Sequence, residues 1–271
     1  MDTLAKALIS RASGQSELRG DDVVICEVDL AMIHDSGGPR RVKPILDRLQ
    51  RQVWDKDKIV VVTDHYVPAD NAETQAIQAL TKQWVQDQSI DKFYDEQGIC
   101  HVVLPERGHL APGLFCVGGD SHSPTGGAFG AYMFGIGATE MAGVLATGEI
   151  WIKVPETILM SWRNQLSAYV TAKDMMLAMC RKIGMGGGRY QAIQYAGQTI
   201  QALSMQERMT LSNMAAELGA QAGLIAPDEA TVAFVQAAGG TVPANWRDFQ
   251  IEAAESAENV MQFDSASLEP Q

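Results

Sequence analysis

The sequence predicts a layered α/β fold, and three observations support that prediction. Short apolar runs typical of strands alternate along the chain with segments of helical periodicity. The run at residues 59–63 is almost continuously apolar, as in parallel strands that are buried on both faces. No internal repeat or low-complexity tract interrupts the alternation. Strands that alternate with helices build a sheet covered by helical layers.

In the first half of the chain, residues 2–12 have the spacing of an amphipathic helix, with Leu4, Ala5, Leu8 and Ile9 on one face. Runs rich in Val, Ile and other strand-forming residues predict strands at 22–33, 59–63, 99–104, 114–117 and 151–161. Helical spacing predicts helices at 41–52 and 71–87 and within the small-residue-rich stretch 126–148.

The second half repeats this alternation. We expect helices at 173–183, 205–219 and 227–238, and a strand at 190–195. Gly219 closes the second of these helices, and Pro227 favours the first turn of the third. From Glu252 the chain is acidic and rich in Ser and Ala, with nothing obvious to pack against.

Composition excludes some classes of protein. At 271 residues the chain is long enough for two α/β domains. Its net charge of −12 argues against nucleic acid or an anionic membrane as a partner. It has no apolar stretch of the roughly 18–20 residues that a membrane span needs. The N-terminus lacks the layout of a signal peptide, so we expect a cytoplasmic protein.

The four cysteines are scattered, and no C-x-x-C pair occurs. Cys26, Cys100 and Cys116 lie in strand-like runs, and Cys180 lies in a helix-like one. We therefore expect buried structural thiols, and we do not expect a metal or iron–sulfur site made from these four alone.

Three of the five histidines stand beside an acid, in the segments His34-Asp35, Asp64-His65 and Asp120-Ser121-His122. The last two segments follow apolar runs, and sites in open α/β sheets form at the carboxyl ends of strands. A carboxylate beside an imidazole fixes its tautomer and raises its basicity, as proton transfer requires. A tight turn with a hydrogen-bonded histidine is the alternative interpretation at both places.

Two further positions are ambiguous from the residues alone. His101 lies in a strand-like run, where a core histidine with a structural hydrogen bond is the more common case. Asn213 and Glu217 are four residues apart, hence on one face of the expected helix, and a solvent-facing polar stripe explains such a pair equally simply. The glycines at 135 and 137 do not fit a dinucleotide-binding fingerprint.

Several short motifs occur in a recognisable order: Thr63-Asp64-His65, Gly98-Ile99-Cys100-His101, Gly119-Asp120-Ser121-His122-Ser123, Ser212-Asn213-Met214 and Ala226-Pro227-Asp228-Glu229. Their order and spacing over residues 20–230 resemble the aconitase superfamily, most closely its 3-isopropylmalate dehydratase large subunits and homoaconitase-like members. The resemblance covers only the N-terminal part of such a subunit.

The resemblance implies three-layer α/β/α domains of aconitase type, with mostly parallel sheets. We expect a first domain at residues 1–155 and a second at 156–250. Residues 251–271 would be an acidic tail or the start of a missing cluster-bearing domain.

The activity that the resemblance implies is removal and re-addition of water on a substituted malate at a [4Fe-4S] cluster. The implied histidine–carboxylate pairs are Asp64 with His65, Asp120 with His101, and Glu217 with His122. In that scheme His65 helps to protonate the departing hydroxyl, and His122 with Glu217 orients the iron-bound water. Ser121 and Asn213 would lie beside the cluster and the ligand.

The chain departs from the family in two respects. The family's cysteine ligands are absent, and none of the four cysteines here falls at their positions. After His34, the chain reads Gly38-Pro39-Arg40-Arg41 where isopropylmalate enzymes often have Ser-Pro-Gln. Arg40 would then contact a different acid near His34, or would be a surface charge.

The family takes its catalytic base from a swivelling domain or a small subunit, so we expect such a partner and a small hydroxy-dicarboxylic acid substrate. We expect the isolated chain to bind no cluster and to turn over no substrate. A cluster-free, inactive fragment that serves as a binding or scaffold module is the main alternative. A zinc-dependent hydrolase built from His65, His122 and carboxylates is a third.

Overall fold

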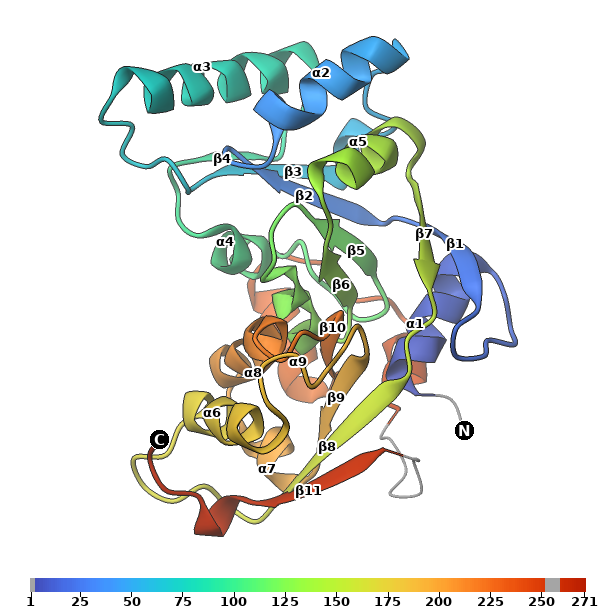
Figure 1. The fold of residues 1–271 in the computed structure, drawn as a ribbon, viewed down its shortest axis with the longest axis vertical. Helices are drawn as coiled ribbons and strands as arrows, with labels where there is room; N and C mark the ends of the chain where they lie inside the picture. The colour runs from blue at the N-terminus through green and yellow to red at the C-terminus, as the bar shows by residue number, and fades with distance from the viewer. Residues whose placement is uncertain (1–2, 252–258) are drawn as a thin grey trace.

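The first sheet is parallel throughout and carries the strand order β4-β3-β2-β5-β6 (Figure 1). The computed structural model describes residues 3–251 and 259–271. The strands of this sheet are β2 (Leu30–His34), β3 (Ile59–Thr63), β4 (Phe93–Asp95), β5 (Phe115–Gly118) and β6 (Tyr132–Gly135). The predicted strand at 59–63 is confirmed to the residue.

Helices cover both faces of this sheet, which makes three layers. One face packs against α1 (Leu4–Ser13), α2 (Pro39–Leu49), α3 (Ala72–Asp87) and α5 (Ala138–Thr147). The other face packs against α4 (Cys100–Glu106), the 3-10 turn Ser123–Phe129, α8 (Met205–Asn213) and α9 (Glu229–Ala237). Alternate residues of β2 divide between these two cores: Ala31 and Ile33 join the first, and Leu30 and Met32 join the second. The predicted α/β fold with mostly parallel sheets is confirmed.

The second sheet is also parallel, in the order β10-β9-β8-β11. Its strands are β8 (Thr157–Arg163), β9 (Ala192–Ala196), β10 (Ala222–Ile225) and β11 (Val260–Asp264). The helices α6 (Ala172–Ile183) and α7 (Gln198–Ala202) pack on one face together with α8. On the other face, the backbone N–H of Leu4 in α1 donates to Gln194 of β9.

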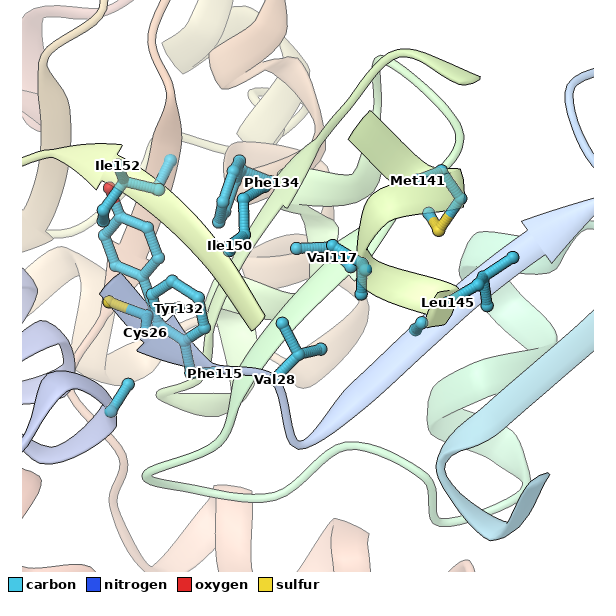
Figure 2. Packing of buried hydrophobic residues seen from close by; sticks show 14 of the residues in the cluster. Cys26, Val28, Phe115, Val117, Tyr132, Phe134, Met141, Leu145, Ile150 and Ile152 are labelled. Atoms are coloured by element: carbon cyan, nitrogen blue, oxygen red, sulfur yellow. The ribbon is translucent and has the colours of Figure 1, made fainter. Parts of the chain in front are cut away.

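A two-stranded antiparallel ribbon connects the halves of the molecule. Its strands are β1 (Val23–Glu27) and β7 (Glu149–Lys153). Figure 2 shows Cys26, Ile150 and Ile152 of this ribbon near Phe115 and Tyr132 of the first sheet. The single strands predicted at 22–33 and 151–161 are therefore each two strands, because the chain leaves the ribbon between them.

Residues 99–104 form most of a helix, α4, so the predicted strand is wrong. Cys100, Val103 and Leu104 are buried, whereas Ile99 and Val102 are 62% and 38% exposed. Burial at positions i, i+3 and i+4 is the pattern of a helix that lies against a core. From the sequence alone, a run this short and apolar fits a buried strand as well as a helix, and only its packing in the fold distinguishes the two structures.

The predicted helical stretch at 126–148 contains the end of a 3-10 turn, strand β6 and α5, so it is only partly helical. The helix predicted at 205–219 ends at Asn213 and continues as a 3-10 turn at Met214–Ala216. The predicted tail falls partly on residues 252–258, which lie outside the described residues. Beyond them β11 pairs with β8, and Phe263 stacks on Trp162 at 4.4 Å between ring centroids.

None of the described helices is both long and apolar enough to cross a membrane.

Candidate active site

Asp120 is the centre of a cluster of histidines at the carboxyl end of the first sheet. Its Oδ1 accepts hydrogen bonds from His101 Nε2 at 2.6 Å and from the backbone N–H of His122 at 2.7 Å. Its Oδ2 lies 3.5 Å from His65 Nε2 and 4.0 Å from His34 Nε2. One carboxylate therefore faces four histidines that come from the ends of different elements.

The loop after β5 places Asp120 at this position. The backbone N–H of Gly119 donates to Met32 O in the neighbouring strand β2 at 2.9 Å, which extends the sheet by one residue. The hydrogen bond from His101 holds the pKa of Asp120 well below its usual range, although burial opposes the shift. The Asp120 carboxylate is therefore ionised at neutral pH and can stabilise positive charge on the histidines around it.

His34 is buried and neutral. Its Nε2 donates to Gly119 O at 2.9 Å and its Nδ1 accepts from the backbone N–H of Ser36 at 3.2 Å, so the network assigns the proton to Nε2. Burial, with His65 as the second cause, lowers the pKa of His34. The ring stacks on that of His65 with 3.9 Å between centroids. The stacked pair therefore combines a buried ring, His34, with one that is 36% exposed, His65.

His65 has a carboxylate at each ring nitrogen. Nδ1 lies 2.6 Å from Asp64 Oδ1, and Nε2 faces Asp120. The other oxygen of Asp64 accepts from the backbone N–H of Cys100 at 2.6 Å, which fixes the carboxylate at the first turn of α4. The ring is 36% exposed, so it can exchange a proton with a ligand.

Asp35 is a residue of the site that the sequence showed only as the neighbour of His34 and that was not among the expected catalytic residues. It is fully buried and accepts from the backbone N–H groups of His65 at 3.1 Å and Tyr66 at 2.9 Å. It therefore positions the loop that carries His65 after β3. The signal that could have found it is its place directly after His34, but its role depends on the pairing of β2 with β3.

The side chains of His34, Asp35, Asp64 and His65 bring possible ligand atoms within 4.8 Å of one another. Hydrogen bonds explain this proximity: His34 uses both ring nitrogens, and Asp35 is surrounded by backbone N–H donors. Ring nitrogens and carboxylate oxygens that already take part in such hydrogen bonds are poorly placed to hold a metal ion.

A second histidine–carboxylate pair adjoins this cluster. His122 Nε2 lies 3.1 Å from Glu217 Oε1, and Nδ1 lies 3.2 Å from Ser121 Oγ. The rings of His101 and His122 are 6.3 Å apart between centroids. Oε2 of Glu217 is buried and has no hydrogen-bond partner among the described residues. A buried oxygen without a donor is costly and predicts a group that donates to it when the site is complete.

Asn213 and Glu217 do not share a helical face, because α8 ends at Asn213 and a 3-10 turn separates the two residues. Asn213 Nδ2 donates to Thr125 Oγ1 at 2.9 Å, next to the segment that carries His122. The solvent-facing stripe is therefore not what the structure shows for this pair, since both side chains contact the loop after β5.

Arg40 is tied to the loop of His65. Its Nε donates to Ser36 O at 2.9 Å, one Nη donates to Tyr66 Oη at 3.1 Å, and its Cζ lies 5.4 Å from the Tyr66 ring centroid. These contacts fix the guanidinium beside the residue that follows His65.

A cleft of about 1310 Å³ opens beside the second pair. Its lining includes Ser121, Pro124, Gly135, Trp151, Tyr190 and Ala216. It lies between the edge of the first sheet at β6, the ribbon strand β7 and the segments that flank the second sheet. The exposed end of the histidine cluster therefore adjoins a large open space.

The cysteines do not fit the ligand set of an iron–sulfur cluster. Cys26, Cys100 and Cys116 are buried, in agreement with the prediction of structural thiols, and Cys180 is half-buried. Burial raises the pKa of Cys26 to about 12, and burial together with Asp64 raises that of Cys100. In the described part of the chain, no group of three or more possible ligand atoms includes a cysteine sulfur, so these thiols do not come together as a cluster site would need.

The fifth histidine lies apart from the cluster. His109 Nε2 is 2.5 Å from Tyr94 Oη, and burial lowers its pKa to about 4. It has no contact with Asp120 among the described residues.

A parallel α/β architecture with histidine–carboxylate pairs at strand ends defines a protein suited to proton transfer. The profile of the aconitase family (aconitate hydratase) matches residues 6–271. The chain belongs to the aconitase family.

Curated relatives agree with this assignment. Over 270 residues the chain is 41% identical to a "Probable 3-isopropylmalate dehydratase large subunit" of Methanothermobacter thermautotrophicus, covering 99% of this chain and 64% of that protein. It is 42% identical to "3-isopropylmalate dehydratase large subunit 1" of Methanopyrus kandleri, with the same coverage. A "Probable methanogen homoaconitase large subunit" of Methanosarcina mazei is 44% identical over 214 residues, 79% of this chain and 55% of that protein. The chain thus spans less than two thirds of the length of these relatives.

Proposed function

We propose that this chain is the larger part of an aconitase-type hydro-lyase subunit that removes and re-adds water on a substituted malate such as 3-isopropylmalate. The observation that carries the proposal is the arrangement around Asp120, where one ionised carboxylate faces the rings of His65, His101 and His34. Hydroxide is a poor leaving group, so dehydration needs a positioned proton donor. The names of the relatives support the substrate class.

His65 is the proton donor in this proposal. Asp64 lies at Nδ1 and Asp120 faces Nε2, so a carboxylate can stabilise positive charge on either side of the ring, while burial lowers the pKa of the stacked His34. A departing hydroxyl group that displaces the contact with Asp120 would receive the Nε2 proton. Asp120 and Asp64 stabilise the positive charge of the ring before the transfer, and the neutral ring takes up a proton from solvent afterwards.

His122 holds Glu217 in place, and the pair orients a water molecule or hydroxyl in the same site. Glu217 holds Nε2, and Ser121 lies at Nδ1, so the ring is fixed on both sides. The buried Oε2 of Glu217 would accept a hydrogen bond from that water or hydroxyl. Asn213 supports the loop through Thr125.

The [4Fe-4S] cluster that the family implies would supply a Lewis acid for the hydroxyl group. Because the four cysteines here do not fit as its ligands, we propose that its thiolates come from the part of such a subunit that this chain does not cover in its relatives. The cleft beside Ser121 is the place where that part would close the site.

The same reasoning gives the partner and the remaining assignments. The relatives are named large subunits, and we propose a small subunit or swivelling domain that carries the catalytic base. Arg40 would bind one carboxylate of the substrate. We also propose a cytoplasmic enzyme without nucleic-acid or membrane partners, with a first α/β domain at residues 1–155 and a second at 156–250.

The test is an anaerobic assay of a hybrid large subunit. This chain replaces the matching 64% of the Methanothermobacter thermautotrophicus relative, and the hybrid is assembled with that protein's small subunit. We expect 3-isopropylmalate to be dehydrated, as measured by ultraviolet absorbance of the unsaturated acid, and the isolated chain to show no turnover. A soluble, iron-loaded hybrid that acts on none of isopropylmalate, dimethylmalate, methylmalate or homocitrate would refute the proposal and favour a scaffold role.

A further inference from the structure

A second cavity, of about 460 Å³, lies at the carboxyl ends of β9 and β10. We call it the Arg208 cavity; its lining includes Tyr195, Ile200, Arg208, Ile225, Pro227 and Glu229. None of the residues assigned to the site around Asp120 lines it. Its volume is within the range of small-molecule sites, and carboxyl ends of parallel strands are where α/β proteins bind ligands.

Arg208 supplies this cavity with a buried cation that is only partly satisfied. The residue is 1% exposed. Its Nε donates to Leu203 O at 3.2 Å, and one Nη donates to Gln201 O at 3.0 Å and to Asp228 Oδ2 at 2.6 Å. The remaining nitrogen, Nη1, is buried without a hydrogen-bond partner among the described residues. Native proteins rarely leave such a donor unpaired, which predicts an acceptor from outside the fold.

The first turn of α9 adds donors at the same place. Asp228 is the N-cap of this nine-residue helix, and its Oδ1 accepts from the backbone N–H of Thr231 at 3.0 Å. The N–H groups of Glu229 and Ala230 precede that capped position and have no partner within the helix. Helix N-termini carry partial positive charge, so the turn and Arg208 Nη1 together favour a carboxylate.

The charged side chains around the cavity argue against a ligand that carries only negative charges. Asp228 already neutralises Arg208, and Glu229 adds a carboxylate that is 77% exposed at the edge of the cavity and lies 3.4 Å from Arg247 Nη2. Tyr195, Ile200 and Ile225 belong to the lining and to the apolar core of the second sheet, so the cavity borders that core. A ligand that matches these groups has one carboxylate, one ammonium group and an aliphatic portion.

We propose that the Arg208 cavity binds a small α-amino acid with an apolar side chain. The carboxylate would accept from Arg208 Nη1 and the first turn of α9, and the ammonium would face Glu229. Arg208 and Asn213 both belong to α8, so a ligand in the cavity would contact the same helix that leads to Glu217.

Titration calorimetry of this chain with L-norleucine, hexanoate and pentylamine tests the proposal. Norleucine should bind, and pentylamine should bind at least about tenfold more weakly because it cannot satisfy Arg208. Hexanoate should bind about two- to fivefold more weakly, since the contact it lacks is with a largely exposed carboxylate. No binding of norleucine, or equal binding of norleucine and hexanoate, would overturn the assignment.

Two variants locate the site without touching the residues around Asp120. Glu229→Gln should weaken the binding of norleucine about two- to fivefold and leave the affinity for hexanoate unchanged. Glu73→Gln is the matched control, an exposed acid in the first turn of α3, and should change neither affinity. Ala226→Leu, which fills the cavity and leaves every polar group in place, should abolish binding while the melting temperature is retained. Norleucine binding that survives Ala226→Leu would place the ligand elsewhere and contradict the proposal.

Discussion

Replacing Asp120 by asparagine removes the charge on which the site depends and changes its shape very little. The carboxylate accepts from His101 Nε2 at 2.6 Å and from the backbone N–H of His122 at 2.7 Å. Hydrogen bonds to a charged group contribute about 1.5–3 kcal/mol each. Asparagine keeps one oxygen for these donors, so we expect Asp120→Asn to lower the free energy of unfolding by about 2 kcal/mol at pH 7.

The difference in the free energy of unfolding between wild type and Asp120→Asn should become smaller as the pH falls. The hydrogen bond from His101 depresses the pKa of Asp120 in the folded state, whereas the unfolded chain has the ordinary value of about 4. The stabilisation is therefore complete above about pH 4 and is lost as the pH falls towards the folded pKa. Asparagine has no such dependence, so the gap between wild type and variant should be about 1 kcal/mol narrower at pH 3 than at pH 7.

Urea unfolding followed by tryptophan fluorescence at pH 7 and pH 3 measures this gap. Asp91→Asn is the control, because that side chain is 85% exposed and should change neither the stability nor its pH dependence. Equal stability of wild type and Asp120→Asn at pH 7, or a gap that stays constant down to pH 3, would refute the reasoning.

Three other predictions concern the pair at Glu217, the thiols and Arg40. In the hybrid subunit, Glu217→Gln should lower kcat about 100-fold through misorientation of His122, and an unchanged kcat would contradict that role. With a thiol reagent at pH 8, Cys180 should react before Cys26, whose pKa burial raises to about 12; faster labelling of Cys26 would contradict its burial. Arg40→Leu should raise KM about tenfold or more and leave kcat within threefold, as expected for loss of a carboxylate contact; an unchanged KM would remove Arg40 from the substrate site.

Helices and strands with a clear hydrophobic pattern could be predicted from the sequence, whereas a short apolar segment such as α4 could not. The helical spacing of α3 extends over its whole length, and β3 is a continuous apolar run, so both agree with their predicted ranges. The segment of α4 is too short for its period to distinguish a helix from a strand. Strand β11 follows an acidic stretch, and its partner β8 lies about one hundred residues earlier, as in the pair Asp264 and Arg163.

The candidate site shows the same division between local and long-range information. Asp64 and His65 are adjacent, so their contact could be expected from the sequence itself. His122 and Glu217 are 95 residues apart, and only the family resemblance suggested that they pair. The sequence showed Asp35 only as a neighbour of His34, because its acceptor role depends on backbone groups that β3 brings to the end of β2. Roles that arise from packing between distant segments need the fold before they can be recognised.

The most direct test of the proposed chemistry compares two histidines in the hybrid subunit. His65 lies between Asp64 and Asp120, whereas His109 is paired with Tyr94 away from the cluster. We predict that His65→Gln lowers kcat for 3-isopropylmalate by about 100-fold or more, as for loss of a general acid, and that His109→Gln changes it less than twofold. If His65→Gln retained the kcat of the unmodified hybrid, His65 would not be the proton donor and the proposed mechanism would be wrong.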